Sequence, residues 1–363
     1  MWRVALLLVV GCGKHLNPAW CAQPGRSDPA CDGMDLIDAA SDASAGACTV
    51  DRDCPDTACL PGGSCAVASR VLYAASSGRG DTCTRDAKCL LATAIAAAQP
   101  GKNIILLEQG TYVGAVAIGR AVQIVGRLAT LQGDASAATV TVNDVDAELD
   151  YVTITGGGTS GISCPGGTLV AHGITVTQNQ QGIASGCRLT LEQSVISSNG
   201  GGALAISGGV IRVRNNFLFG NGPSPQKIAN VTIALGVTGS FVFNTVANND
   251  AKANSTTSGV DCQAANLVVD GNLITDNLLN KKLGDPQVSG TCDFSRSYTA
   301  PGTGGNDLAW RNVVAADYHL TAGSTPVLDQ PAGTLTCDGI DDFDGQTRPQ
   351  GHGCDYGADE FKP

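Results

Sequence analysis

The chain has 363 residues, with 47 glycines, 4 % aromatic residues, 15 % charged residues and a net charge of -11. This length allows a sizeable core, and the many glycines with few bulky side chains suit a fold of repeated tight turns. The acidic balance argues against a nucleic-acid partner, because phosphates require patches of Lys and Arg. No apolar run reaches the roughly 18 residues that a membrane span needs.

The first residues have the pattern of an export signal. A positive start at Arg3 precedes a short apolar run that ends in Leu-Val-Val-Gly-Cys12, which resembles a bacterial lipobox. The resemblance implies a lipoprotein signal peptide over 1–11 and a membrane anchor through a lipidated Cys12. Gly13 in place of Asp after that cysteine implies sorting to the outer membrane of the bacterial envelope. The alternative is an ordinary signal that is cleaved near Ala22, which would give an extracellular protein.

Cysteine parity agrees with lipidation. The chain has 15 cysteines, so a lipidated Cys12 leaves 14 for disulfides in an oxidising compartment. Residues 12–68 form a Cys-rich linker without apolar periodicity, and the run from Cys48 to Cys65 resembles the cysteine-stapled stalks of myxobacterial surface lipoproteins. A zinc site is the rival interpretation, but paired CxxC spacing is missing. The pairing stays open for the six cysteines of this region, which are Cys21, Cys31, Cys48, Cys54, Cys59 and Cys65.

Regular structure is expected from about Arg70 onward. The patterns predict strands over 71–73, 104–107 and 110–112, and a helix over 88–99 that ends at Pro100-Gly101. This order of elements is similar to the N-terminal entry of right-handed parallel β-helix proteins of the pectin-lyase-like superfamily. The C-terminal segment from Asp355 to Phe361 resembles the closing motif of such secreted proteins. The resemblance implies an all-β solenoid over 69–330, with an N-terminal capping helix and a closing segment over 331–363.

The repeat itself is carried by asparagines. Each of five asparagines lies three residues after an apolar residue, at intervals of 20, 22, 28 and 28 residues, which is typical of a β-solenoid. Stacked coils lie about 4.8 Å apart, so we expect amide ladders along the axis, with Asn adopting the left-handed turn conformation. The first column is Asn179, Asn199, Asn221, Asn249 and Asn277; a second is Asn216, Asn244 and Asn272.

The same frame predicts disulfides. Cys164 and Cys187 lie about one coil apart, so adjacent coils would bring them within bonding reach. We also expect the pairs Cys262–Cys292, Cys83–Cys89 and Cys337–Cys354.

One outward column carries charge. The position seven residues before the Asn, or before Gly157 in the Asn place one unit earlier, reads Asp150, His172, Glu192 and Arg214 in successive units, which predicts an exposed row of alternating charge. The simplest interpretation is a solvated ladder of opposite charges. The functional interpretation is a carbohydrate site, with Asp150 and Glu192 about 9–10 Å apart as in an inverting glycoside hydrolase and His172 moving protons.

The resemblance alone does not decide this question. The pectin-lyase-like superfamily contains polysaccharide lyases and polygalacturonases, but the polygalacturonase Asn-Thr-Asp and Arg-x-Lys signatures and the pectate-lyase Trp-Ile-Asp-His segment are missing from this sequence.

The segments 223–227, 251–258 and 278–305 read as insertions on one edge of the solenoid, where stacked loops often form a binding surface. Their basic residues would bind an anionic polymer or a partner protein. These residues are Lys227, Lys252, Lys281, Lys282 and Arg296.

An acidic run near the C-terminus is the candidate cation site. Asp338, Asp342 and Asp344 could supply oxygens to Ca²⁺, although no Glu follows at EF-hand spacing. The alternative is a capping turn that pairs with Arg348. No other cofactor is expected. The remaining histidines, including His319, read as isolated residues without ligand spacing.

The sequence therefore favours a cell-surface lipoprotein whose β-helix is a non-catalytic structural or binding module, adhesin-like, for an extracellular polysaccharide or a surface protein. The alternative is a divergent polysaccharide lyase or inverting glycoside hydrolase.

Overall fold

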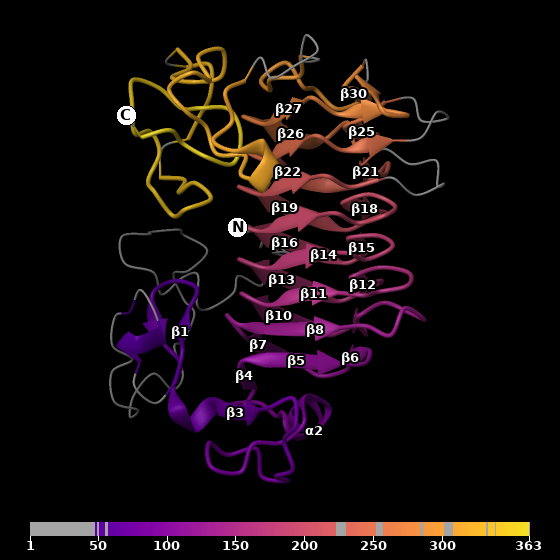
Figure 1. The fold of residues 1–363 in the computed structure, drawn as a ribbon, viewed down its shortest axis with the longest axis vertical. Helices are drawn as coiled ribbons and strands as arrows, with labels where there is room; N and C mark the ends of the chain where they lie inside the picture. The colour runs from indigo at the N-terminus through magenta and orange to yellow at the C-terminus, as the bar shows by residue number, and fades with distance from the viewer. Residues whose placement is uncertain are drawn as a thin grey trace, which may run out of the picture.

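The computed structural model describes residues 48, 51–54, 57–222, 230–251, 257–283, 286–300, 308–331, 333–337 and 339–362. Within these residues the chain winds into a parallel β-helix whose coils each contribute one strand to three sheets (Figure 1). Each strand pairs in parallel with its counterpart one coil later, as β10 (Asp146–Asp150) does with β13 (Thr168–His172). The predicted fold class is confirmed.

The sheets run the length of the solenoid. Among the described residues, the first sheet contains β3 Val71–Ala74, β4 Ile104–Leu107, β7 Val122–Val125, β10, β13, β16 Arg188–Glu192, β19 Val210–Arg214, β22 Thr238–Val242 and β26 Leu267–Asp270. The second contains β5 Gly110–Val113, β8 Ala129–Gln132, β11 Thr153–Thr155, β14 Thr175–Thr177, β17 Val195–Ser197, β20 Phe217–Phe219, β23 Thr245–Ala247 and β27 Leu273–Thr275. The third contains β6 Val116–Ile118, β9 Val140–Val142, β12 Ile162–Cys164, β15 Ile183–Ser185, β18 Leu204–Ile206, β21 Val231–Ile233, β25 Val260–Cys262 and β30 Val288–Gly290.

The smaller elements lie at the ends and edges of the solenoid. They are β1 Cys59–Leu60, β2 Ser64–Cys65, β24 Asp250–Ala251, β28 Leu278–Leu279, β29 Lys282–Leu283, the α-helix α2 Leu91–Ala97, and the 3-10 helices η1 Asp51–Asp53, η2 Ala68–Arg70 and η3 Val313–Ala315.

A single apolar core runs along the axis, because strand residues alternate between the inside and the outside. Leu169 and Ala171 of β13 point inward and are fully buried, and Leu189 and Leu191 stack on them one coil later. Helix α2 closes the N-terminal end of this core with its apolar face (Figure 1). It is shorter than predicted, because Leu90 and Ala98 at its two ends have extended backbones.

Two buried amide ladders run beside the core. In the first, the Nδ2 of each Asn donates to the Oδ1 of the next, at 3.0 Å for Asn179 to Asn199 and 2.8 Å for Asn249 to Asn277. Each Nδ2 also donates to backbone carbonyls, so these buried amides are well satisfied. Gln287 ends the ladder by accepting from Asn277 at 2.8 Å. The second ladder joins Asn216, Asn244 and Asn272 in the same way.

The left-handed turn residue is the one before each Asn, which corrects the expectation that Asn itself adopts this conformation. The single left-handed residue lies in the turn between two sheets, and the side chain of the Asn that follows is buried. These turn residues are Gln178, Ser198, Gly220, Asn248 and Asp276 in the first ladder and Asn215, Phe243 and Gly271 in the second.

The first ladder begins at Gly157, which occupies the Asn position one coil earlier. Its N–H donates to the Oδ1 of Asn179 at 2.8 Å. A Cβ atom on Gly157 would lie 1.9 Å from the carbonyl oxygen of Ser160. An Asn at this position is therefore excluded by the local chain path, and the ladder cannot extend further toward the N-terminus.

The described end of the Cys-rich region is a small hairpin, β1 and β2, that lies against the outer face of the first sheet (Figure 1). Ala58 and Ala66 pack with Val71 and Ile104 in one apolar cluster. Arg127 of the solenoid donates to the Asp51 carboxylate at 3.0 Å and to the Cys59 carbonyl at 3.1 Å. We call residues 48–66 the N-terminal knot.

The part of the chain that follows the last coil, residues 308–362, packs along the flank of the second sheet (yellow in Figure 1). It begins before the expected boundary at residue 331, and we call it the closing segment. Gln193 donates to the Asp342 carbonyl at 2.7 Å, and the N–H of Ala358 donates to the Thr245 hydroxyl at 2.9 Å. Inside the segment, the buried Arg348 guanidinium binds Glu360 at 2.8 Å. This segment therefore contacts several coils at once.

The four disulfides expected from the repeat are present as bonded pairs: Cys83–Cys89, Cys164–Cys187, Cys262–Cys292 and Cys337–Cys354. In the knot, Cys48 is bonded to Cys59 and Cys54 to Cys65. Cys12, Cys21 and Cys31 lie outside the described residues. Among the described helices, none combines the length and the apolar character needed to cross a bilayer.

Candidate functional site

The charged column forms as the repeat predicted. The parallel register aligns Asp150 with His172, His172 with Glu192 and Glu192 with Arg214, on the successive strands β10, β13, β16 and β19. Because neighbouring strands of a sheet lie about 4.8 Å apart, the column brings a carboxyl, an imidazole, a second carboxyl and a guanidinium close together.

The expected exposure of Asp150 is wrong, because side chains of the preceding coil reach it. The residue is fully buried, and the Nε2 of Gln123 donates to its Oδ2 at 2.8 Å. Its Oδ1 is buried without a hydrogen-bond partner. Burial, and then the nearby Glu148, raise the pKa of Asp150 well above its usual value, and burial also raises the pKa of Glu148. Burial therefore favours the protonated form of both carboxyls at this end of the column.

His172 is half-buried and neutral in character. Its ring meets Tyr151 edge-on, with the ring centroids 5.5 Å apart, and the Arg127 guanidinium stacks over Tyr151 at 3.6 Å. Burial lowers the pKa of His172, while Glu192 opposes that change. The imidazole is therefore held in the uncharged form by its surroundings.

Glu192 is engaged by two arginines. Its Oε1 lies 2.8 Å from the Nε of Arg212 and 3.0 Å from the Nε of Arg214, and its Oε2 accepts from Arg214 at 3.1 Å. The carboxylate is only 17 % exposed. A general base must accept a proton from water or substrate, and here the oxygens are already occupied by two guanidinium groups. The upper half of the column thus has the geometry of a charge-paired ladder.

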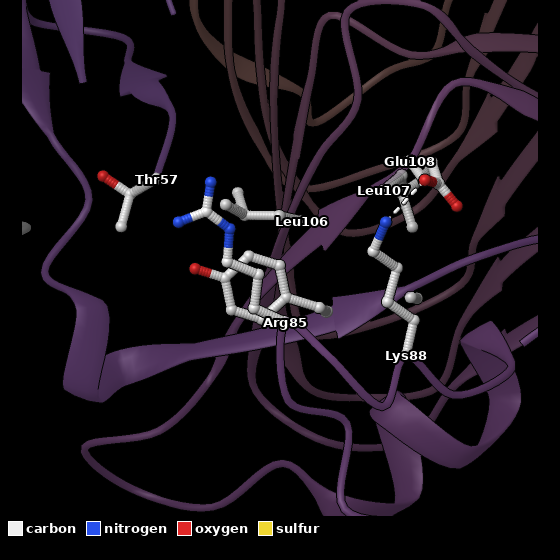
Figure 2. Close-up of a pocket in the computed structure, with 8 residues that line it drawn as sticks. Thr57, Arg85, Lys88, Leu106, Leu107 and Glu108 are labelled. Carbon is white, nitrogen blue, oxygen red and sulfur yellow. Dashed lines mark hydrogen bonds and ion pairs between the residues drawn. The ribbon is translucent and has the colours of Figure 1, made fainter. Parts of the chain in front are cut away.

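Cavities occur elsewhere on the described surface. One of about 200 Å³ lies between the knot and the first coils, and its lining includes Thr57, Arg85 and Lys88 (Figure 2). Lys88 forms an ion pair with Glu108 at 2.5 Å. A second cavity of about 200 Å³ lies where the closing segment meets the second sheet, and Phe217 and Tyr318 are among its lining residues. Neither cavity is lined by the Asp150 column.

The described residues of the proposed basic edge do not lie together. Lys227 and Lys252 lie outside the described residues, and Lys281 and Lys282 lie at the small β28–β29 hairpin. The placement of Arg296 on this edge is wrong, because 278–305 contains most of another coil, including β30. Arg296 lies one coil above Gly271, which donates to its carbonyl at 2.8 Å.

Arg296 also has partners of its own. Its guanidinium binds Asp270 at 2.9 Å and the Thr334 carbonyl at 3.1 Å. It therefore joins the last coils to the closing segment.

The two predicted calcium ligands among the described residues, Asp342 and Asp344, do not group with each other as ligands. Asp338 lies outside the described residues. Both oxygens of Asp342 accept backbone N–H groups, from Gln346 at 2.7 Å and from Glu360 at 3.2 Å. Asp344 instead lies beside His319, with 3.4 Å between its Oδ2 and the Nε2 of the ring. The turn interpretation of Asp342 therefore agrees with the geometry.

The description of His319 as isolated is also wrong. Its Nδ1 lies 2.5 Å from the Oδ1 of Asp317, and ligand-type atoms of His319, Asp344 and Asp359 all lie within 4.8 Å of one another. The spacing Asp317-x-His319 was the only local signal in the sequence, because the other two acids come from distant positions.

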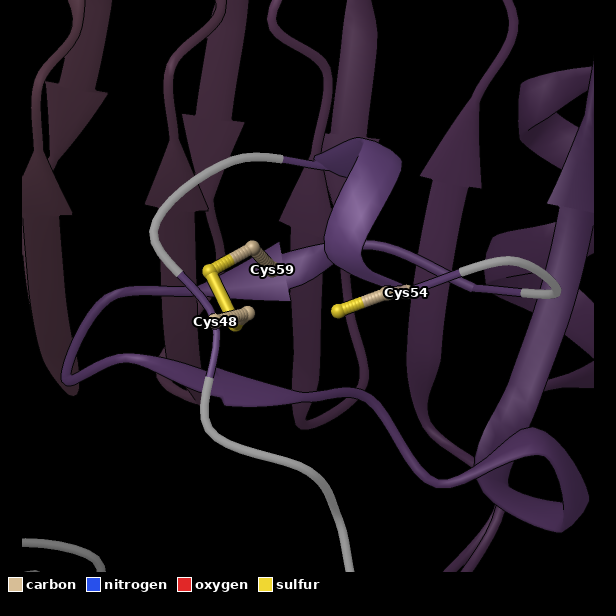
Figure 3. Close-up of side chains that lie close together, drawn as sticks. All are labelled: Cys48, Cys54 and Cys59. Carbon is tan, nitrogen blue, oxygen red and sulfur yellow. A yellow bond between two sulfur atoms is a disulfide. The ribbon is translucent and has the colours of Figure 1, made fainter.

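Three cysteines of the knot also cluster, as Figure 3 shows for Cys48, Cys54 and Cys59. Zinc binds cysteine as the thiolate. Here Cys48 and Cys59 share a disulfide and Cys54 is bonded to Cys65, so these sulfurs are not available as metal ligands. The geometry supports the stapled module rather than the zinc alternative.

Comparisons with known proteins add little about activity. No protein-family model matches the chain, and no curated protein matches it. A structure described as the crystal structure of pectate lyase Pel9A is similar, with 14 % sequence identity, a TM-score of 0.44, and coverage of 80 % of this chain and 96 % of the other. A likeness at this level supports no statement about catalysis or ligands.

Proposed function

We propose that the protein is a cell-surface lipoprotein, anchored through Cys12, whose β-helix is a non-catalytic structural and binding module for an extracellular polysaccharide or a surface protein. The main observation behind this proposal is the state of the charged column. Glu192 is paired with two arginines, and Asp150 is buried against Gln123. Neither carboxylate is free to act on a substrate in the way an acid–base pair requires.

The buried amide ladders also support a structural and binding role. Side-chain amides that bond from coil to coil hold the stacked coils in a fixed register, and the repeated coils offer repeated contacts to a long polymer. The lipid anchor is proposed from the sequence pattern at Cys12 and agrees with the disulfides, which form in oxidising compartments.

The anchor has a direct test. Metabolic labelling with a palmitate analogue is expected to label the wild-type protein and not the Cys12→Ser variant. Mass spectrometry that finds an unmodified Cys12 inside the mature chain would overturn this part of the proposal.

A catalytic alternative has one observation in its favour. The raised pKa values of Asp150 and Glu148 are a feature of general acids in glycosidases. A divergent lyase or an inverting hydrolase would use this end of the column, with His172 beside it.

One screen separates the two functions. The full-length chain, with Cys12→Ser to remove the lipid attachment site, is applied to a glycan array and to a panel of polysaccharides in a depolymerisation assay. Glu192→Gln and Asp150→Asn are tested beside it. Binding without cleavage supports the binding module. Cleavage that either substitution abolishes would establish an enzyme and refute the proposal.

A further inference from the structure

The closing segment contains a group of metal-binding side chains that is separate from the charged column. His319 follows η3, Asp344 lies in a turn, and Asp359 lies near the C-terminus, so the group exists only in the folded segment. One ligand atom from each of these side chains lies within 4.8 Å of the others. A metal ion at the centre of such a triangle would lie within bonding distance of all three after small rotamer changes.

The imidazole is already oriented as a ligand. Its Nδ1 lies 2.5 Å from the Asp317 carboxylate, which fixes the tautomer and directs the Nε2 toward Asp344. A carboxylate behind the ring is the usual outer partner of a metal-bound histidine. The Nε2 atom is buried and has no hydrogen-bond partner, although Asp344 is only 3.4 Å away. An unpaired buried ring nitrogen beside two carboxylates is explained by a cation between them.

The two acids differ in their surroundings in a way that suits an open site. Asp359 is buried, and its Oδ2 accepts the Leu320 N–H at 2.7 Å, which leaves the other oxygen for an ion. Asp344 is 43 % exposed. A cavity of about 200 Å³, lined by Phe217, Tyr318 and His319 among others, adjoins the ring. Solvent can therefore supply further ligands.

We propose that His319, Asp344 and Asp359 bind a divalent transition-metal ion, with Asp317 as the positioning residue that orients the imidazole. One nitrogen and two carboxylate oxygens suit Zn²⁺, Co²⁺ or Mn²⁺ better than Ca²⁺, which prefers an all-oxygen shell. The site would tie three distant parts of the closing segment together, so metal binding would stabilise the segment against the flank of the solenoid.

The test uses the untagged, full-length chain with Cys12→Ser and intact disulfides. Zn²⁺ is titrated by calorimetry, and Co²⁺ binding is followed by its visible absorption. We expect one ion per chain in the wild type and a rise in Tm with Zn²⁺. His319→Ala and Asp344→Asn should weaken binding at least about tenfold, and Asp317→Asn by about 10–100-fold. His352→Ala is the matched control, because His352 is an exposed histidine of the same segment.

Three results would overturn the assignment: no binding of Zn²⁺ or Co²⁺ by the wild type, equal binding by His319→Ala, or loss of binding in His352→Ala. Asp344→Asn keeps the test valid if His319→Ala misfolds, since Asp344 is partly exposed and the amide has nearly the same shape. A normal near-ultraviolet spectrum for Asp344→Asn together with unchanged Zn²⁺ affinity would also refute the site.

Discussion

The contribution of the first amide ladder to the stability of the solenoid can be measured with the substitution Asn249→Ala. The Asn249 Nδ2 donates to the Leu218 carbonyl and to the Asn277 Oδ1, both at 2.8 Å. Its Oδ1 accepts from the Asn221 backbone at 3.0 Å and from the Asn221 side chain at 2.9 Å. Alanine removes all four contacts without changing the backbone.

The expected cost follows from what is left behind. The Asn221 N–H and the Leu218 carbonyl lose partners in the interior, and each unsatisfied buried group costs about 1–3 kcal/mol. We therefore expect a loss of about 2–6 kcal/mol in the free energy of unfolding. Asn143→Ala is the control, because Asn143 is exposed and a surface change of this kind is expected to stay within about 0.5 kcal/mol.

The assay is guanidinium unfolding of the wild type and both variants with disulfides intact, followed by circular dichroism. Local loss should also appear as faster amide exchange at Asn221 than in the wild type. If Asn249→Ala and Asn143→Ala have the same midpoint, the ladder does not stabilise the coils, and the energetic reasoning used here is refuted.

Three further outcomes are expected. Burial raises the folded-state pKa of Asp150, so its ionisation lowers the stability of the wild type as the pH rises above about 4, the unfolded value. The unfolding midpoint of Asp150→Asn should therefore increase relative to that of the wild type as the pH rises. A difference that stays constant with pH would contradict this. Arg348→Met leaves the buried Glu360 without its charged partner and should lower the free energy of unfolding by about 3–5 kcal/mol. Arg311→Gln at the surface should change the unfolding midpoint little. Equal effects of the two substitutions would be evidence against stabilisation by the buried pair. Replacing both Cys48 and Cys59 by Ser should destabilise the knot locally by about 2–4 kcal/mol, which is seen as faster amide exchange near Arg127, while exchange within the second sheet stays unchanged.

The repeat could be predicted because its information is local and periodic. Residues such as Leu169 and Ala171 report which face of a strand is inward, and the recurring Asn marks the same turn in each coil. The column of Asp150, His172 and Glu192 followed directly from that frame. Its register needed no knowledge of contacts between distant segments.

The predictions that were wrong concern contacts that the repeat period does not encode. The burial of Asp150 depends on Gln123 from another coil, and a position in a repeat does not give its neighbours' rotamers. Arg296 was misplaced because the last coil lacks the marker Asn, and Gln287 takes the ladder position instead. His319 meets Asp359 only through an irregular segment with no period at all.

The position of the closing segment along the second sheet affects the order in which the coils unfold. A stack of coils in which each touches only its neighbours tends to unfold from its ends, one repeat at a time. Here Gln193, Thr245 and Gly271, from different coils, all bond to the same short stretch of chain around Asp342 to Ala358. The last coils cannot separate singly without releasing that stretch. We therefore expect them to open together as one cooperative unit, with fraying confined to the opposite end.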